Sequence, residues 1–451
     1  MMAATSRAPA RPRKAARIMD SLRRLLELAG SGRAPPDRCP SPLSSAMGSS
    51  GRRRSVRASS WLGCQLLEST RAPGAHWLRY AEGGRPLPPY YAAITGAGIV
   101  CPAGHSKAGL AEALRAGHRF HGWVTRFEVP EDGPQFACEV DDYDLSEVLG
   151  SKKSRIDPVQ SHFLATCRYA LEEADLSVGD GPRDDVGVAY ATTYGPAQSV
   201  EQYSRRLADR GARYANPIMF NNTYINAAPS LAAIEWGLRG PNHTLCAGWV
   251  GGVAALDTAL RALETQAAEV MLAGASESLS ETVYLDLCSR GIVAMGENPG
   301  DARDLTGMVP SEGAGALVLE HPEAAEGRGA STLGTLLAAA HESAPDSASA
   351  YGAALSRALD GAPEPALYLS PADGIESLAT AEHEALRRAG LTHDAVRTVR
   401  LADMLGEMMA ASAPVAIALA LMILDPGETA LIGALDDGAG GAVVVTKGDA
   451  S

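Results

Sequence analysis

The feature that most limits the possible folds is an alternation of short apolar runs with helical patterns, which occurs twice along residues 91–448. The runs are short and bounded by turn residues, as in buried strands, and the segments between them repeat apolar residues at helical spacing. Strands that alternate with helices form mostly parallel sheets with helices on their faces. The sequence therefore predicts an α/β protein built from two similar α/β halves.

The individual elements follow from this pattern. In the first half we expect strands at 92–100, 185–193, 269–273 and 314–320, and helices at 106–116, 157–174 and 254–268. In the second half we expect strands at 366–370, 398–402 and 442–446, and helices at 350–359, 379–389 and 408–424.

Residues 1–90 differ in composition from the rest of the chain. They carry 16 Lys and Arg against 5 Asp and Glu, whereas residues 91–451 carry 24 against 48. Three explanations remain open: a start codon placed too far upstream, a disordered tail, or an Arg-rich organelle-targeting peptide. Within this segment, 17–28 has the pattern of a short amphipathic helix. We expect an N-terminal extension at 1–90 and two halves at 91–325 and 326–451.

Composition and spacing argue against several function classes. The acidic body disfavours nucleic-acid binding. No apolar run reaches the roughly 18–20 residues that span a bilayer, and 413–424 is expected to be a buried helix. We find neither metal-ligand spacing nor a dinucleotide-binding glycine motif around Gly96 and Gly98, so we expect no metal and no cofactor. The cysteines form no CxxC pair, as expected for reduced thiols in a cytoplasmic protein: Cys39, Cys64, Cys101, Cys138, Cys167, Cys246 and Cys288.

The segment from Arg239 to Leu256 combines a short apolar run, a turn of small residues and a long helical pattern. A sharp strand-to-helix turn presents a side chain at a helix N-terminus. There, backbone N–H groups and the helix dipole stabilise negative charge. Such a position suits a thiolate and an oxyanion hole.

This segment resembles the active-site region of β-ketoacyl synthases. In that family Gly-Pro-Asn is followed, after six residues, by the nucleophilic cysteine and then by a glycine three positions further on. Gly240, Pro241, Asn242 and Gly252 match this spacing without a gap, and Trp249 stands at the cysteine position. An indole cannot act as the nucleophile that forms a thioester.

Other segments resemble the same family in the same order. Gly438-Ala-Gly-Gly441 resembles its terminal glycine turn, with Ala439 where the family usually has a gating phenylalanine. The further matches are Ile94 to Pro102, Asn216 to Pro241, Leu272 to Glu277 and Val309 to Glu320. Together they cover about residues 91–448.

The histidines and lysine that the resemblance leads us to expect are also replaced. Asp373 falls at the first histidine position, although counting back from Glu382 would select Pro371 instead. Glu407 falls at the second histidine position and Ala402 at the lysine position. In the family, the two histidines support malonyl decarboxylation and stabilise the enolate.

The resemblance implies a thiolase-like fold with five αβαβα layers. With its catalytic set replaced, the chain is most similar to the chain length factor, or ketosynthase β subunit, of type II polyketide synthases. Such a subunit pairs as a heterodimer with a catalytic ketosynthase α subunit and shapes the tunnel for a polyketide carried on acyl carrier protein. Members usually carry glutamine at the cysteine position, so Trp249 is a departure from the pattern.

Two other hypotheses remain open. The chain could be a repurposed malonyl decarboxylase or acyltransferase that uses Asp373, Glu407 or Cys246, or a structural or regulatory homologue without a tunnel. We expect Cys246 to be a structural thiol on the buried strand before the nucleophile turn. His243 is expected to be a loop or core histidine, and His383 to lie on the solvated face of a helix.

Overall fold

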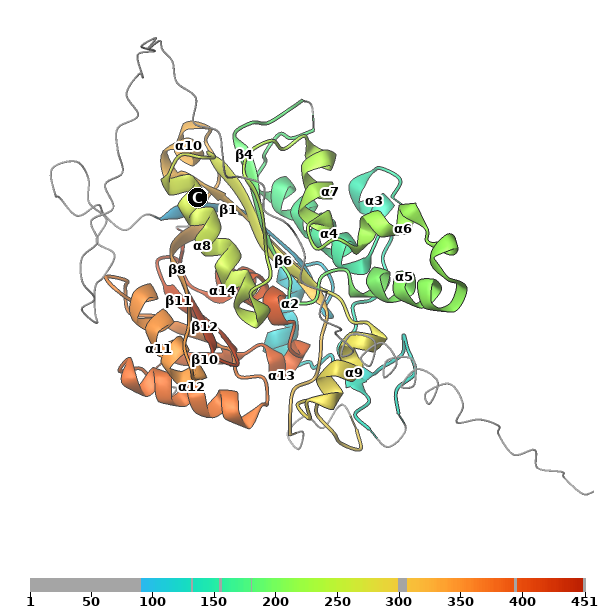
Figure 1. The fold of residues 1–451 in the computed structure, drawn as a ribbon. Helices are drawn as coiled ribbons and strands as arrows, with labels where there is room; N and C mark the ends of the chain where they lie inside the picture. Colours follow the sequence, from blue (N-terminus) through green and yellow to red (C-terminus); the bar gives the residue numbers. More distant parts are fainter. Residues whose placement is uncertain are drawn as a thin grey trace, which may run out of the picture. The chain divides into compact units, whose positions relative to one another are not determined.

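The computed structural model describes residues 91–130, 133–153, 156–179, 181–298, 306–392 and 396–448, all within the unit His76–Ser451 (Figure 1). The extension at 1–90, with its expected helix at 17–28, lies outside the described residues, and the domain boundaries stay a prediction. The strands are β1 (Ala92–Val100), β2 (Gly122–Trp123), β3 (Phe136–Ala137), β4 (Val186–Ala191), β5 (Asn242–Leu245), β6 (Val270–Glu277), β7 (Gly313–Glu320), β8 (Gly334–Ser343), β9 (Leu367–Ser370), β10 (Arg397–Arg400), β11 (Thr429–Asp436) and β12 (Ala439–Lys447).

Within the described residues, ten of these strands form one sheet in the order β10-β9-β11-β12-β8-β1-β7-β6-β4-β5. From the middle outward, β1-β7-β6-β4-β5 and β8-β12-β11-β9-β10 repeat the same topology, including the direction of each pairing. A short antiparallel pairing of β1 with β8 joins the two half-sheets. The predicted duplication is therefore present in the fold.

The direction of the strands corrects one expectation. We expected mostly parallel sheets, but the sheet is mixed: β7 and β12 each pair antiparallel with both neighbours. The pattern missed this because β11 and β12 are joined by the tight turn at Asp437 and Gly438 instead of by a helix, and such a hairpin reverses the chain.

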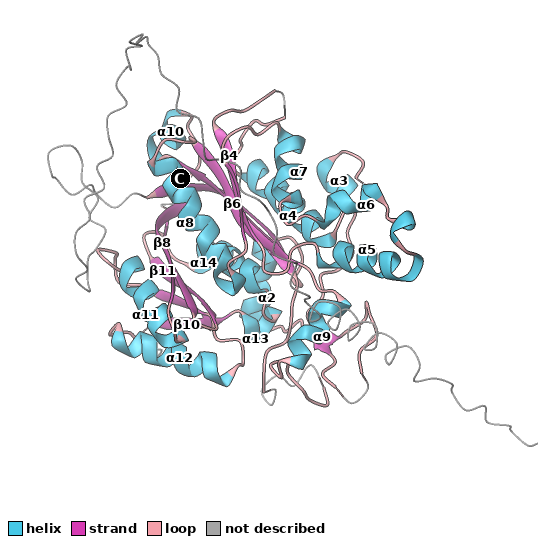
Figure 2. Ribbon diagram, in the orientation of Figure 1, coloured by secondary structure: helices cyan, strands magenta, loops and turns pink. Residues whose placement is uncertain are grey.

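Helices cover both faces of each half-sheet, which gives the five αβαβα layers (Figure 2). The outer layer of the first half contains α4 and α7, and that of the second half contains α11 and α12, while α8 and α14 contact both half-sheets. The helices are α2 (Lys107–Ala116), α3 (Leu145–Leu149), α4 (Pro158–Glu173), α5 (Ala197–Arg210), α6 (Pro217–Phe220), α7 (Ala227–Trp236), α8 (Gly251–Glu264), α9 (Glu281–Ser289), α10 (Pro322–Gly327), α11 (Ser347–Ala358), α12 (Glu376–Arg388), α13 (Ala402–Leu405) and α14 (Ser412–Ile423), with the 3-10 turns η1 (Ala212–Tyr214), η2 (Asn221–Thr223), η3 (Gly248–Val250) and η5 (Met409–Ala411).

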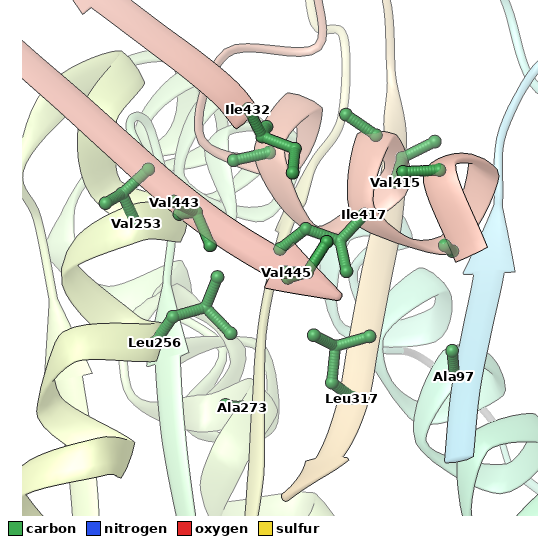
Figure 3. Close-up of a cluster of buried hydrophobic side chains, with 14 of the residues drawn as sticks. Ala97, Val253, Leu256, Ala273, Leu317, Val415, Ile417, Ile432, Val443 and Val445 are labelled. Atoms are coloured by element: carbon green, nitrogen blue, oxygen red, sulfur yellow. The ribbon is translucent and has the colours of Figure 1, made fainter. Parts of the chain in front are cut away.

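The middle layer explains why α14 is apolar on every side. Its Ile417 lies near Val445 of β12, and Val415 belongs to the same buried cluster as Val443 of β12 and Leu317 of β7 (Figure 3). A helix covered by sheets on two sides buries its whole surface, so it needs no polar face. The buried helix expected at 413–424 is therefore confirmed. No helix among the described residues is long and apolar enough to cross a membrane.

Glycines set the close contact between β1 and α4. A Cβ atom on Gly98 would overlap the carbonyl oxygen of Thr166, which lies in α4. Relief of that overlap requires the helix to move away from the sheet, and overpacking of this kind costs about 1–3 kcal/mol.

We therefore expect Gly98→Ala to lower the free energy of unfolding by about 3 kcal/mol, at the upper end of that range. Gly327→Ala is the matched control, because a Cβ at that position of α10 meets nothing within 4 Å. Urea unfolding followed by circular dichroism measures both variants. Equal stability of the two variants would contradict the packing described here.

Candidate functional site

Trp249 lies in the turn η3, directly before α8. Gly248 begins this turn with a φ of 60°, a conformation that glycine adopts at little cost. The indole is 6% exposed and packs in a buried cluster with Met409 of η5 and with Tyr351 and Tyr368 of the second half. The predicted nucleophile position thus holds a core side chain at the start of a buried helix.

The backbone N–H of Trp249 already has an acceptor. Asp436, at the end of β11, accepts it through Oδ2 at 3.0 Å. A free N–H at the first turn of a helix is the group that would bind an oxyanion. In this protein a carboxylate of the same chain takes that hydrogen bond.

Glu407 performs a similar function at η5, which leads into α14. Its Oε1 accepts the backbone N–H of Met409 at 2.6 Å and the hydroxyl of Ser412 at 2.8 Å. Its own backbone is fixed by hydrogen bonds with Val309 and Ser311. The side chain is therefore held in one orientation, with its carboxylate at the N-terminal end of the helix.

Asp373 is 6% exposed in the loop after β9, and its Oδ2 has no hydrogen-bond partner within the described residues. Oδ1 accepts the backbone N–H of Ile375 at 2.9 Å. Burial raises the pKa of Asp373, and the negative charges of Glu382 and Asp436 raise it further. Burial also raises the pKa of Glu407, and the charges of Asp373 and Asp436 add to that effect. Both carboxyl groups therefore bind their protons more tightly in the folded protein than in water.

Trp249 and Glu407 both line one small cavity. Its volume is about 30 Å³, and its lining includes Trp249, Ser370, Pro371, Ala402, Glu407 and Met409. That is room for one or two water molecules. Side chains therefore leave little free space around Trp249 and Glu407.

The structure thus brings together three of the predicted site positions, Trp249, Ala402 and Glu407. Of the two alternatives for the first histidine position, Pro371 lines the cavity, whereas Asp373 is buried nearby and interacts with Glu407 through its charge. Sequence reasoning missed Asp436. Its only signal was an Asp-Asp-Gly turn, which is typical of a hairpin and gives no indication of a distant partner.

Cys246 corrects an expectation. We placed it on a buried strand, but it is exposed directly after β5, which forms the edge of the sheet among the described strands. Burial of part of the side chain and the negative charge of Glu277 raise the pKa of the thiol, which leaves it a weak nucleophile. His243 also corrects an expectation, because it lies exposed on β5 at the sheet edge and is neither in a loop nor in the core. His383 is exposed on α12, as expected.

Comparison with known proteins decides the family. The model of the β-ketoacyl synthase N-terminal domain matches residues 92–325. The chain belongs to the β-ketoacyl synthase family. Curated relatives include the 3-oxoacyl-[acyl-carrier-protein] synthase 2 of Synechocystis, which is 29% identical over 54% of this chain and 61% of its own length. The actinorhodin polyketide putative β-ketoacyl synthase 2 of Streptomyces coelicolor is 26% identical over 75% of this chain and 86% of its own length.

The chain thus spans about 61% of the length of the first of these relatives. Among solved structures, the ishigamide ketosynthase/chain length factor superposes with a TM-score of 0.71 at 20% identity, over 80% of this chain and 100% of the other. A type II polyketide synthase ketosynthase in complex with its acyl carrier protein gives a TM-score of 0.70 at 19% identity, over 80% and 100%. These structures establish the thiolase-like ketosynthase fold.

The buried carboxyl groups predict a pH dependence of stability. Because the pKa of Glu407 is raised in the folded state, the folded protein holds a proton that the unfolded chain releases near the ordinary pKa of about 4.3. The contribution of Glu407 to the free energy of unfolding is therefore fully present below the unfolded-state pKa, and it is lost as the pH rises through the folded-state pKa. We expect Glu407→Gln to reduce the pH-dependent loss of the free energy of unfolding by about 1–2 kcal/mol, which corresponds to roughly one pKa unit.

Urea unfolding at a series of pH values between 5 and 9 measures the effect. Glu376→Gln is the control, because that carboxyl group is exposed in the first turn of α12. Parallel stability curves for the wild type and Glu407→Gln would show that Glu407 does not titrate in this range.

Proposed function

We propose that this chain is a non-catalytic ketosynthase-like subunit, a chain length factor, that pairs with a catalytic β-ketoacyl synthase and shapes the tunnel for polyketide elongation on acyl carrier protein. One observation carries the proposal: the nucleophile position is a buried indole whose backbone N–H is bound by Asp436. The similarity to the actinorhodin synthase 2 over 75% of this chain supports it. So does the fold shared with the ishigamide ketosynthase/chain length factor.

The chemistry of the site argues against thioester formation. An acyl-enzyme requires a nucleophile, a base and donors for the oxyanion. Here the nucleophile is replaced by an indole, the residue at the second histidine position is a carboxyl group held by Met409 and Ser412, and the candidate oxyanion donor is engaged. A cavity of about 30 Å³ also has no room for an acyl chain.

We propose a partner surface around α5, α6 and β5. No residue of α5 or α6 is buried, although both contain large apolar side chains. The outer edge of β5 carries backbone groups that no described strand pairs with. Exposed apolar side chains gather in the segments that follow α5 and on α7: Tyr214, Ile218, Phe220, Tyr224, Ile225 and Ile234. Of these elements, α7 contacts β5. Exposed apolar side chains and an open strand edge are each typical of a protein interface, and we propose that the catalytic ketosynthase covers both.

One observation favours a second candidate, a decarboxylase. The raised pKa values of Asp373 and Glu407 would suit groups that exchange protons near neutral pH. The small cavity opposes it, because a malonyl group would have to displace Trp249 or Met409. Turnover of malonyl-carrier protein by the isolated chain, lost in Glu407→Gln, would establish this alternative.

The proposed function is tested by producing the chain together with a type II ketosynthase that has an intact Cys-His-His set. We expect a stable complex. We also expect intact-protein mass spectrometry, after incubation with acylated carrier protein, to show an acyl adduct on the ketosynthase and none on this chain. The ketosynthase with its nucleophilic cysteine replaced by alanine is the control and should remain unmodified. An acyl adduct on this chain would refute the proposal.

The partner surface gives a separate prediction. Ile218→Asp places a charge on a side chain that is 57% exposed in α6, and we expect it to weaken the complex at least about tenfold without unfolding the chain. Met295→Asp is the matched control, because Met295 is 55% exposed and lies outside the proposed surface. Analytical ultracentrifugation measures both. An unchanged dissociation constant for Ile218→Asp would place the partner elsewhere.

A further inference from the structure

Asp436 reaches from the end of β11 to the turn that begins α8. Its Oδ2 accepts the N–H of Trp249 at 3.0 Å, and its Oδ1 accepts the N–H of Asp437 at 2.8 Å. A Cβ atom on Gly248 would overlap Oδ2, so the glycine leaves the space that the carboxylate occupies. Both oxygens are therefore fixed, and the side chain has a defined place at the helix start.

The place is one that favours an anion. The turn η3 continues into the 14-residue helix α8, and the N–H groups of its first turn lack partners within the helix. The helix dipole adds partial positive charge at this end. A carboxylate bound there is a charge-assisted acceptor, which is stronger than a neutral one.

We propose that Asp436 is an internal anion that occupies the anion-binding position at the start of α8, so that this position stabilises neither a thiolate nor an oxyanion even when a cysteine is restored at residue 249. The inference rests on the proposed loss of catalysis at this site and is independent of the partner. In this proposal Asp436 is a positioning residue that occupies the anion-binding position, while the indole of Trp249 fills the space beside it.

The charges around residue 249 reinforce the effect. Asp436 interacts electrostatically with Asp373 in the loop after β9, with Glu407 before η5 and with Tyr194 after β4. A thiolate at residue 249 would lie beside the Asp436 carboxylate in a buried site, where a like charge disfavours ionisation. Removal of the Asp436 carboxylate releases the N–H of residue 249 and also removes this repulsion.

The test compares Trp249→Cys with the double variant Trp249→Cys/Asp436→Ser, both in a Cys246→Ser background. Iodoacetamide alkylation across pH 6–10, resolved by peptide mass spectrometry, gives the apparent pKa of the introduced thiol. In the double variant we expect this pKa to be at least about one unit lower, and alkylation at pH 7 to be about tenfold faster, than in Trp249→Cys. Trp249→Cys/Asp437→Ser is the matched control and should behave as Trp249→Cys.

Equal pH profiles for Trp249→Cys and the Asp436 double variant would overturn the proposal. An equal acceleration in the Asp437 control would do the same, because it would indicate a general charge effect. A second measurement does not depend on reagent access: formate should raise the melting temperature of Asp436→Gly by refilling the site, and should leave that of the wild type unchanged. Equal responses of the two would also overturn it. None of these results bears on complex formation with a ketosynthase, so the two proposals fail separately.

Discussion

The close packing of α8 against α14, between the two half-sheets, is the constraint on which the rest of the structure depends. A Cβ atom on Gly252 of α8 would overlap the carbonyl oxygen of Ala410, just before α14, and would press against Pro414. A similar atom on Gly315 of β7 would meet Pro414 and Val415. Gly252 lets the two helices approach each other and Gly315 lets α14 approach β7, and the turns that begin the helices, η3 and η5, come into contact.

This arrangement brings the positive ends of two buried helix dipoles to one place, and it gives a physical reason for the acidic residues found there. Asp436 accepts an N–H at the start of α8, and Glu407 accepts an N–H and a hydroxyl at the start of α14. Carboxyl oxygens in these places satisfy donor groups that have no partner within the helix. Donor groups at both helix starts are here satisfied by the protein's own side chains, which supports the proposed loss of catalysis at this site.

Much of the fold follows from local pattern, although the helices α5, α7 and α9 were not expected, and two missed strands share one cause. The strands β1, β7 and β9 and the helices α2, α4 and α12 were expected close to where they lie, because each buries a face with its own period. The strands β8 and β11 were missed. Both are rich in alanine, leucine and glycine, and such short apolar runs fit a strand or a helix equally well. Their pairing with distant strands decides between the two.

The sequence by itself predicted that an indole stands at the start of a helix where the family has its nucleophile, and that Ala402 and Glu407 stand at two further catalytic positions. Those conclusions depend on residue identity and spacing along the chain. Only the tertiary structure decided that Asp436, 187 residues from Trp249, takes the backbone N–H at that position, that the remaining cavity is about 30 Å³, and that Cys246 is exposed at a sheet edge. The reason is that hydrogen bonds between distant segments and the space left among packed side chains are set by how the layers meet, which no local pattern encodes.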